Sequence, residues 1–296
     1  MTRSVEEIRR LLVGPVNSIP TSFHPDGAID WDGIANIIEV GIASGSQVSL
    51  LTYGDSQMEF LSDEETEQLT RFLVERVGDR TLTVAATRRW STQRMVEFAR
   101  FSQDSGADVL MVLPSEMASV AAKVEQYRAV AEVTPVMLVG WPCHGILDQL
   151  LDVANICCFK EDGSLEYAAQ TLEAYGDHWS FLTGGGLWRN YAQWPWTDAF
   201  FCFFASFAPH VVREYARAAR DRDAVTAIRI IRELERPLFA LVDRAGGNFQ
   251  SLWRVALELN GIAHRGLRHP MATATAEQVE VLRQPLEELG LITHPL

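Results

Sequence analysis

The side chain with the clearest chemical potential in this sequence is the amine of Lys160. Arginine supplies almost all of the positive charge, and the chain holds only two lysines, Lys123 and Lys160. Lys160 ends the apolar run NICCFK (155–160), and EDGS follows it. A lysine among apolar neighbours loses hydration of its charged form, which lowers its pKa and frees the amine to attack a ketone. Arginine stays protonated and cannot do this. Lys160 is therefore a candidate Schiff-base nucleophile, and a structural ion pair is the alternative.

A second candidate is the turn Tyr53-Gly54-Asp55-Ser56, which follows an apolar run that ends at Thr52. A tight loop of this kind exposes hydroxyl and backbone N–H groups. Such groups can bind a carboxylate without the help of a cation. An ordinary connection between a strand and a helix explains the same residues equally well.

Four other side chains are candidates, although each has an ordinary structural explanation. Glu116 could serve, like Asp55, as an acid or base, and Arg88 could hold an anionic substrate. Trp141 could form a wall of the pocket. His144 could bind a distal carboxylate or hydroxyl group of the substrate.

The triplet Gly184-Gly185-Gly186 ends another apolar run. In a barrel this position often holds a phosphate site, but glycines there can also let the substrate approach the backbone. We predict no metal site, because the sequence has no HExxH, DxD or clustered His and Cys pattern. Cys157 and Cys158 are adjacent on a predicted strand, so their side chains should face opposite ways.

Eight apolar runs alternate with segments of helical period, which is typical of a (β/α)8 TIM barrel. The runs are 13–19, 46–52, 81–86, 107–113, 135–140, 155–160, 179–184 and 198–204. The helical segments between them are 31–45, 62–78, 91–106, 119–133, 146–154 and 164–176. Residues 1–208 are predicted to form the barrel core. Residues 209–296 are predicted to add the last barrel helix and a C-terminal helical extension in the same structural unit.

The barrel prediction indicates where the active site should lie, because catalytic groups of such barrels lie at the C-terminal ends of the strands. Lys160 ends the sixth predicted strand and shares a face with Ile156 and Cys158, so it should point into the barrel mouth. Cys157 and Phe159 should face the helices. An open doubly wound sheet is the alternative, but the expected GxGxxG turn is missing from SIPTSFHPDG (18–27).

The bulk composition excludes some classes of partner. The formal net charge of −13 would repel phosphate backbones, which disfavours nucleic acid. We find no run of about 18 apolar residues, which a membrane helix would need, and the N-terminus does not resemble a signal peptide. Four cysteines without paired spacing are expected to be reduced, which predicts a cytoplasmic protein.

Lys160 and the loop after Thr52 together resemble motifs of the dihydrodipicolinate synthase and N-acetylneuraminate lyase family of class I, Schiff-base-forming aldolases and dehydratases. The resemblance begins near residue 13 and includes IPTSFHPDGAID (19–30). In the family, a Gly-Thr-Thr-Gly-Glu loop binds the carboxylate of a 2-oxo acid, and residues 51–55 occupy its place. A strand-six lysine forms the imine, and FKEDGS matches that motif at Lys160.

Three motifs of the family are changed here, and in the carboxylate loop Leu51 and Tyr53 replace the first Gly and the second Thr. The family's Tyr-Asn-x-Pro after strand five, whose tyrosine relays protons, corresponds to VGWP (139–142), and its Pro-Tyr-Tyr corresponds to PSE (114–116). These changes argue against the lysine-biosynthetic activity. The chain resembles relatives that dehydrate 2-keto-3-deoxy sugar acids, which also lack that tyrosine, in the triplets DSQ (55–57), STQ (91–93) and RHP (268–270).

The resemblance implies a lyase that uses a covalent imine with Lys160 and no other cofactor. Lys160 would attack the C2 ketone, and the iminium would make the C3 proton acidic; loss of the C4 hydroxyl is dehydration. Thr52 and Tyr53 would hold the carboxylate, with Tyr53, Glu116, Asp55 or water relaying protons. A pyruvate-dependent aldolase and a catalytically silent ligand sensor are the alternatives. The resemblance also implies a homo-oligomer, either a dimer or a tetramer.

Overall fold

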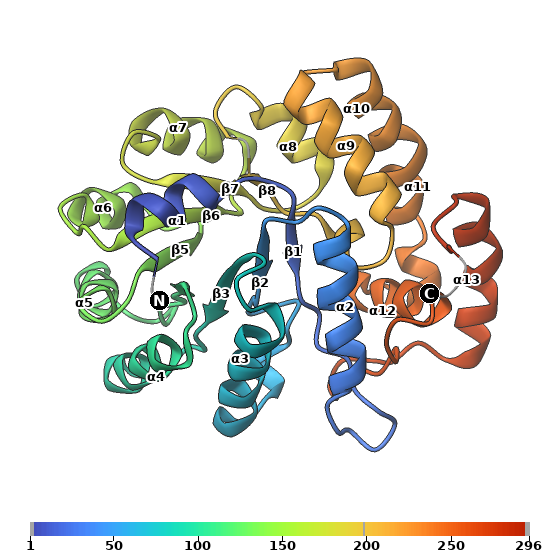
Figure 1. Ribbon diagram of the computed structural model, residues 1–296, viewed down its shortest axis with the longest axis horizontal. Helices are drawn as coiled ribbons and strands as arrows, with labels where there is room; N and C mark the ends of the chain where they lie inside the picture. The colour runs from blue at the N-terminus through green and yellow to red at the C-terminus, as the bar shows by residue number, and fades with distance from the viewer. Residues whose placement is uncertain (1–2, 198, 294–296) are drawn as a thin grey trace.

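The computed structural model describes residues 3–197 and 199–293. Within these ranges eight parallel strands pair in chain order, each with the next (Figure 1). The first and last strands meet through a parallel bridge between Val16 and Phe201, and the Cys202 N–H donates to the Val16 carbonyl at 3.1 Å. The sheet is thus nearly closed, and the predicted (β/α)8 barrel is confirmed.

Except for β6, which is as long as its predicted run but begins one residue later, the strands are shorter than the apolar runs that predicted them. They are β1 (Val16–Ser18), β2 (Val48–Leu50), β3 (Leu82–Ala86), β4 (Val109–Met111), β5 (Val136–Gly140), β6 (Ile156–Glu161), β7 (Ser180–Thr183) and β8 (Ala199–Phe200). The run predicted for the eighth strand begins at residue 198, which lies outside the described residues. Its last two residues belong instead to the 3₁₀ helix η3 (Phe203–Ser206).

Helices follow the strands and surround the barrel (Figure 1). Those around the first seven strands are α1 (Val5–Leu11), α2 (Trp31–Ala43), α3 (Asp63–Val77), α4 (Thr92–Ser105), α5 (Val120–Ala131), α6 (His144–Leu147), α7 (Leu165–Tyr175) and α8 (Leu187–Gln193). The short 3₁₀ turns η1 (Met58–Phe60) and η2 (Asp148–Leu150) follow β2 and α6. Neither α1 nor α8 was predicted. The Arg9 carbonyl of α1 accepts from Ser180 Oγ at 3.3 Å, so α1 lies at the N-terminal end of β7, away from the barrel mouth.

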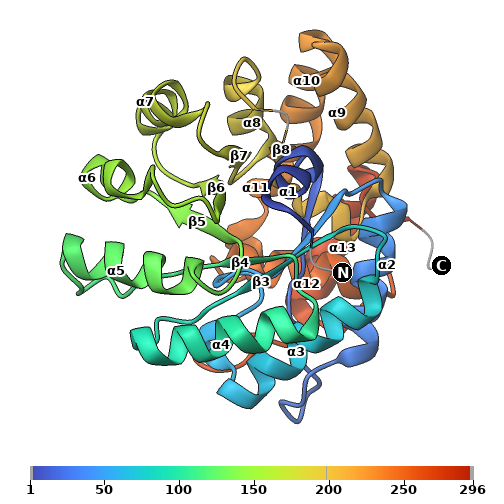
Figure 2. The same ribbon diagram turned by 60° about the vertical axis from the view of Figure 1, so that its left-hand side comes forward.

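The C-terminal segment continues as helices. They are α9 (Pro209–Asp221), α10 (Ala224–Ile230), the π-helical turn η4 (Ile231–Glu235), α11 (Arg236–Phe239), η5 (Val242–Ala245), α12 (Phe249–Leu259) and α13 (Ala276–Glu288). Figure 1 shows α12 beside α2, with α13 on the far side of α12 (Figure 2 gives a second view). Asn36 of α2 donates to the Ile262 carbonyl at 3.0 Å, which attaches the segment after α12 to the barrel. No helix in the described ranges is long and apolar enough to cross a membrane.

The side chains of Cys157 and Cys158 do not face opposite ways, so that prediction was wrong. The pairing of β5 with β6 shifts register between Val136 and Met137, which leaves Cys157 as an extra residue in β6. Such a bulge interrupts the alternation of a strand. The two sulfur atoms lie 3.5 Å apart, and both side chains are fully buried. Alternation resumes beyond the bulge, where the Phe159 ring packs on Phe181.

Candidate active site

Lys160 lies near the end of β6, in the wall of a cavity of about 680 Å³ at the barrel mouth. Only 8% of the residue is exposed. Its Nζ donates to both carboxylate oxygens of Asp162, at 2.5 and 2.7 Å. The amine is thus in an ion pair, which was the alternative to a nucleophile in the sequence analysis. It also borders a cavity that can hold a ligand.

The next residue, Glu161, explains why Lys160 faces the cavity. Glu161 is 1% exposed and accepts from Arg189 Nη2 at 2.7 Å and from Gln193 Nε2 at 3.3 Å. Gln193 in turn accepts from Thr183 Oγ1 at the end of β7. Successive side chains of a strand point to opposite sides. Because α8 holds Glu161 on one side, Lys160 is directed to the other.

The turn after β2 has the geometry of an anion site. Thr52 Oγ1 accepts from the Asp55 N–H at 3.0 Å, and Ser56 Oγ accepts from the Thr52 N–H at 3.0 Å. Within the described ranges, the N–H groups of Tyr53 and Gly54 have no recorded acceptor. Both residues line the cavity that contains Lys160. These N–H groups are therefore free to bind a carboxylate beside the amine.

The carboxylate of Asp55 is held behind this turn. Its oxygens accept from Ser18 Oγ and from Gln250 Nε2, each at 2.8 Å. The fully buried Arg254 of α12 donates to the Asp55 carbonyl at 2.6 Å and to the Thr21 carbonyl at 3.0 Å. Burial lowers the pKa of this arginine to about 10. The C-terminal extension thus supports the turn from behind.

Arg89 joins two of the predicted acid–base candidates. It donates to the Tyr53 hydroxyl at 3.0 Å and pairs with the Glu116 carboxylate. Lys123 donates to the Glu116 carbonyl at 3.3 Å. Burial raises the pKa of Tyr53, and the nearby positive charge of Arg89 opposes this rise. All four residues line the cavity, so one of its walls carries two cations.

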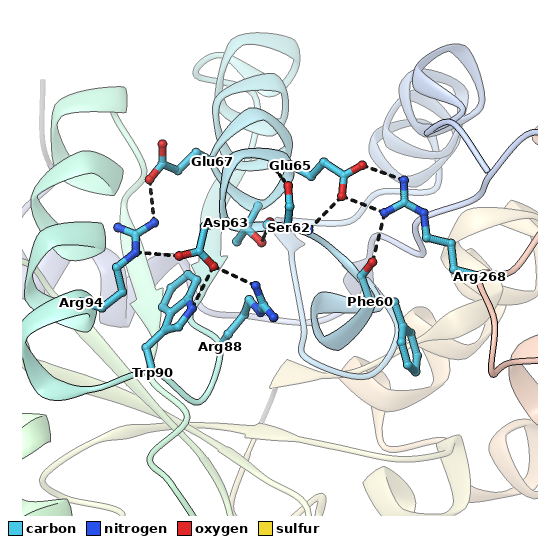
Figure 3. A network of polar contacts seen from close by, with 10 residues as sticks. Phe60, Ser62, Asp63, Glu65, Glu67, Arg88, Trp90, Arg94 and Arg268 are labelled. Carbon is cyan, nitrogen blue, oxygen red and sulfur yellow. Dashed lines mark hydrogen bonds and ion pairs between the residues drawn. The ribbon is translucent and has the colours of Figure 1, made fainter. Parts of the chain in front are cut away.

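The cavity brings together most of the predicted site residues but not all of them. Those that line it are Thr52, Tyr53, Gly54, Asp55, Glu116, Trp141 and Lys160. Arg88 does not: it donates to Asp63 at 2.8 Å, beside Trp90 and Arg94 (Figure 3). His144 also lies outside the lining and packs against the rings of Tyr167 and Tyr175. The positions of Arg88 and His144 therefore do not support substrate contact.

Gly184 and Gly185 likewise lie outside the cavity lining. The region where a phosphate site was considered is filled from within the protein. The carboxylate of Glu235 accepts from the N–H groups of Leu187 and Trp188 at the start of α8. Glu235 is fully buried, and this burial raises its pKa to about 7, against the effect of the two N–H groups. An added phosphate would compete with this carboxylate.

Arg268, the first residue of the RHP triplet, connects segments that are far apart in the sequence. Arg268 pairs with Glu65 through both oxygens, at 2.6 and 2.7 Å, and donates to the Phe60 carbonyl at 3.0 Å (Figure 3). It also donates to the Gly27 carbonyl. These contacts join three segments around the start of α3, away from Lys160.

Among the cavity-lining residues that the sequence interpretation missed are Arg89, Lys123, Tyr127 and Asp162. Two of them carried a signal. Lys123 is the only other lysine of the chain, and Asp162 follows Lys160 by two residues. The choice between Arg88 and Arg89 was not decidable from the sequence, because both follow β3 directly.

Comparisons with known proteins bear on the family of the chain and on its fold. A model of the dihydrodipicolinate synthetase family matches residues 12–289. The chain is 26% identical over 292 residues to a Streptomyces coelicolor protein named "Probable 5-dehydro-4-deoxyglucarate dehydratase 2", which covers 94% of this chain and 90% of that protein. It is also 26% identical over 295 residues to the 4-hydroxy-tetrahydrodipicolinate synthase of Ralstonia nicotianae, with 95% and 98% covered.

Solved structures share the fold. Dihydrodipicolinate synthase from Bacillus clausii has a TM-score of 0.85 at 20% identity, covering 96% of this chain and 100% of that one. A prophage protein of the dihydrodipicolinic acid synthase family from E. coli K12, in complex with pyruvate, has a TM-score of 0.82 at 22% identity, covering 95% and 99%.

Proposed function

The chain belongs to the dihydrodipicolinate synthetase family and is a lyase, and we propose that it acts by condensing the Lys160 amine with the ketone of a 2-oxo acid. One observation carries the proposal. A single cavity contains the Lys160 amine and, in its wall, the turn whose Tyr53 and Gly54 N–H groups have no recorded acceptor among the described residues. A 2-oxo acid has a ketone beside a carboxylate, so it can engage both features at once.

The reaction that fits best is dehydration of a 2-keto-3-deoxy sugar acid. Condensation at C2 converts the ketone to an iminium, which withdraws electrons and makes the C3 proton acidic. Loss of that proton and expulsion of the C4 hydroxyl then yields an unsaturated product. The relative from S. coelicolor carries a dehydratase name, and a tyrosine is missing after β5, where Val139, Gly140 and Trp141 line the cavity.

The charge of the cavity supports a substrate with a second carboxylate. Arg89 and Lys123 both lie in the wall. The Glu116 carboxylate pairs with Arg89, whereas Lys123 donates to the Glu116 backbone carbonyl and forms no ion pair among the described residues. One positive charge is therefore left over in this part of the wall. A sugar acid with a carboxylate at each end could place the first on the turn at Thr52 and the second near these cations.

A pyruvate-dependent aldolase is the second candidate, because the similarity to the Ralstonia synthase has the same 26% identity. The two activities share the imine and differ in the bond that breaks afterwards. Incubation with a 2-keto-3-deoxy acid separates them. Release of pyruvate indicates cleavage between C3 and C4, whereas a dioxo acid or semialdehyde product indicates dehydration.

Borohydride trapping tests the covalent step. Borohydride reduces an imine to a stable amine, so mass spectrometry of peptides from protein treated with pyruvate and other 2-oxo acids should locate an adduct on Lys160. Lys123 lines the same cavity and is the internal control. Lys160→Arg should abolish the adduct, and Lys123→Arg should retain it. An adduct on Lys123, or binding of 2-oxo acids without any adduct, would contradict the proposal; the second result would indicate a ligand sensor.

A further inference from the structure

We propose that Asp162 is the catalytic acid–base of this site and moves the protons for Lys160. The inference rests on the proposed Schiff-base function and names the group that replaces the missing tyrosine. Asp162 contacts the reacting nitrogen through both oxygens, at 2.5 and 2.7 Å, and its side chain also lines the cavity. A general base must lie within hydrogen-bond reach of the proton that it takes, and Asp162 meets this condition for the protons of the Lys160 amine.

Among the described residues, the Asp162 carboxylate accepts hydrogen bonds only from Lys160. Condensation removes N–H groups from the lysine nitrogen, because an iminium nitrogen carries one hydrogen where an ammonium carries three. The reaction itself therefore frees at least one carboxylate oxygen of Asp162 from the nitrogen. The freed carboxylate stays at the imine, where the acidic C3 proton appears.

The side chains of the other acid–base candidates already form hydrogen bonds or ion pairs with neighbouring residues. Arg89 holds both the Tyr53 hydroxyl and the Glu116 carboxylate. The Glu116 side chain is 78% exposed, so water surrounds it. Both oxygens of Asp55 already accept hydrogen bonds from side chains behind the turn. None of these groups has a recorded contact with the Lys160 amine in the described part of the chain.

The proton steps balance with Asp162 alone. The carboxylate first takes a proton from the Lys160 ammonium, and the free amine attacks C2. The acid returns this proton to the C2 oxygen, takes a second proton from the nitrogen and passes it to the same oxygen, which leaves as water and forms the iminium. The carboxylate next takes the C3 proton, which gives the enamine. The nitrogen electron pair expels the C4 hydroxyl, and the Asp162 proton completes the second water molecule. Addition of one water to the iminium finally releases the product ketone and restores the Lys160 ammonium.

Neighbouring residues hold Asp162 in place. The Asp162 N–H donates to the Gly140 carbonyl of β5 at 3.1 Å. The buried pair of Glu161 with Arg189 fixes the preceding residue, and Arg189 also donates to the Gly163 carbonyl. Asp162 is therefore bracketed on both sides along the chain, which limits the positions that its carboxylate can reach. Such restraint is expected of a group that must stay at one nitrogen through several steps.

The test uses pyruvate, whose methyl protons exchange with deuterated water when the enamine forms and reverses. We would measure two rates for the full chain, the exchange by NMR and borohydride trapping on Lys160. Asp162→Asn should slow the exchange at least 100-fold, within the usual range for loss of a general base. Asp162→Ala should be equally slow, and added formate should restore part of its rate by supplying a carboxylate. Asp152→Asn, which changes an exposed carboxylate, is the matched control.

Each outcome decides between distinct conclusions. Exchange by Asp162→Asn within about threefold of the parent, or faster trapping, would overturn the role of Asp162 and leave the Schiff base intact. Faster trapping would mean that Asp162 only holds the amine in its charged form. Absence of trapping in the parent protein would overturn the proposed function and this inference together. Circular dichroism would verify folding, and formate rescue separates lost chemistry from lost structure if Asp162→Asn is unstable.

Discussion

Gly184 at the end of β7 leaves the space that the carboxylate of Asp162 occupies. A Cβ atom added to Gly184 would lie 1.8 Å from Asp162 Oδ1, far inside van der Waals contact. The glycine triplet considered as a phosphate site thus has a different structural role: it lets two strand ends approach so that an acid can reach Lys160.

Gly184→Ala should therefore displace Asp162 from the amine. We expect kcat to fall about 100-fold, as a misplacement of about 1 Å can cause. In the Asp162→Asn background, Gly184→Ala should lower kcat much less, because the side chain that it displaces has already lost its function. Steady-state kinetics of the four proteins measure this coupling. Gly145→Ala, where an added Cβ meets no atom within 4 Å, is the control, and additive effects would argue against the relationship.

Lys123→Met should reveal whether a second carboxylate binds in the cavity. Removing one cation should raise KM about tenfold for a 2-oxo-3-deoxy acid with two carboxylates, equivalent to about 1.4 kcal/mol. For the analogue with one carboxylate, KM should change less than about twofold. Arg128→Met alters the same helix at a residue paired with Asp152 and should leave both values unchanged. Equal changes for both substrates would contradict a distal subsite.

Arg254→Leu should weaken both the fold and the carboxylate turn. The substitution leaves the carbonyls of Thr21 and Asp55 without this donor, and unsatisfied buried groups cost about 1–3 kcal/mol each. We expect the free energy of unfolding in urea to fall by about 3 kcal/mol, with a higher KM for pyruvate. Arg220→Leu changes an exposed arginine and is the control. A loss below about 0.5 kcal/mol would show that Arg254 is dispensable.

Glu235→Gln should change how stability depends on pH. Burial raises the pKa of Glu235 from 4.5 to about 7 in the folded protein, so the folded state binds a proton that the unfolded state has lost. The associated stability is complete below about pH 4.5 and is lost as the pH rises through about 7. Between pH 5 and 8 the free energy of unfolding of the parent should fall by about 3 kcal/mol relative to that of the variant. Urea titrations across this range measure the difference.

The exposed Glu277 of α13 provides a matched carboxylate for that comparison. Glu277→Gln should run parallel to the parent at every pH. A constant difference between the parent and Glu235→Gln would mean that Glu235 does not titrate differently in the two states.

The sequence determined the barrel and the residue most suited to the chemistry. Apolar runs of strand length, alternating with capped helical segments, predict a parallel sheet because both periodicities are local properties of the chain. Lys160 was recognisable because arginine cannot perform amine chemistry, and the turn at Thr52 was recognisable from its residue types. These inferences need only neighbours along the chain.

The tertiary structure decided which side chains join Lys160. A bulge at Cys157 reset the alternation of β6, and the burial of Glu161 against Arg189 directed its neighbours. Arg89 rather than Arg88 lines the cavity because Asp63 of α3 pairs with Arg88. Such choices depend on contacts between segments far apart in the sequence. The local sequence pattern does not indicate which of two adjacent arginines, or which of several acids, will contact residues from other segments and so line the cavity.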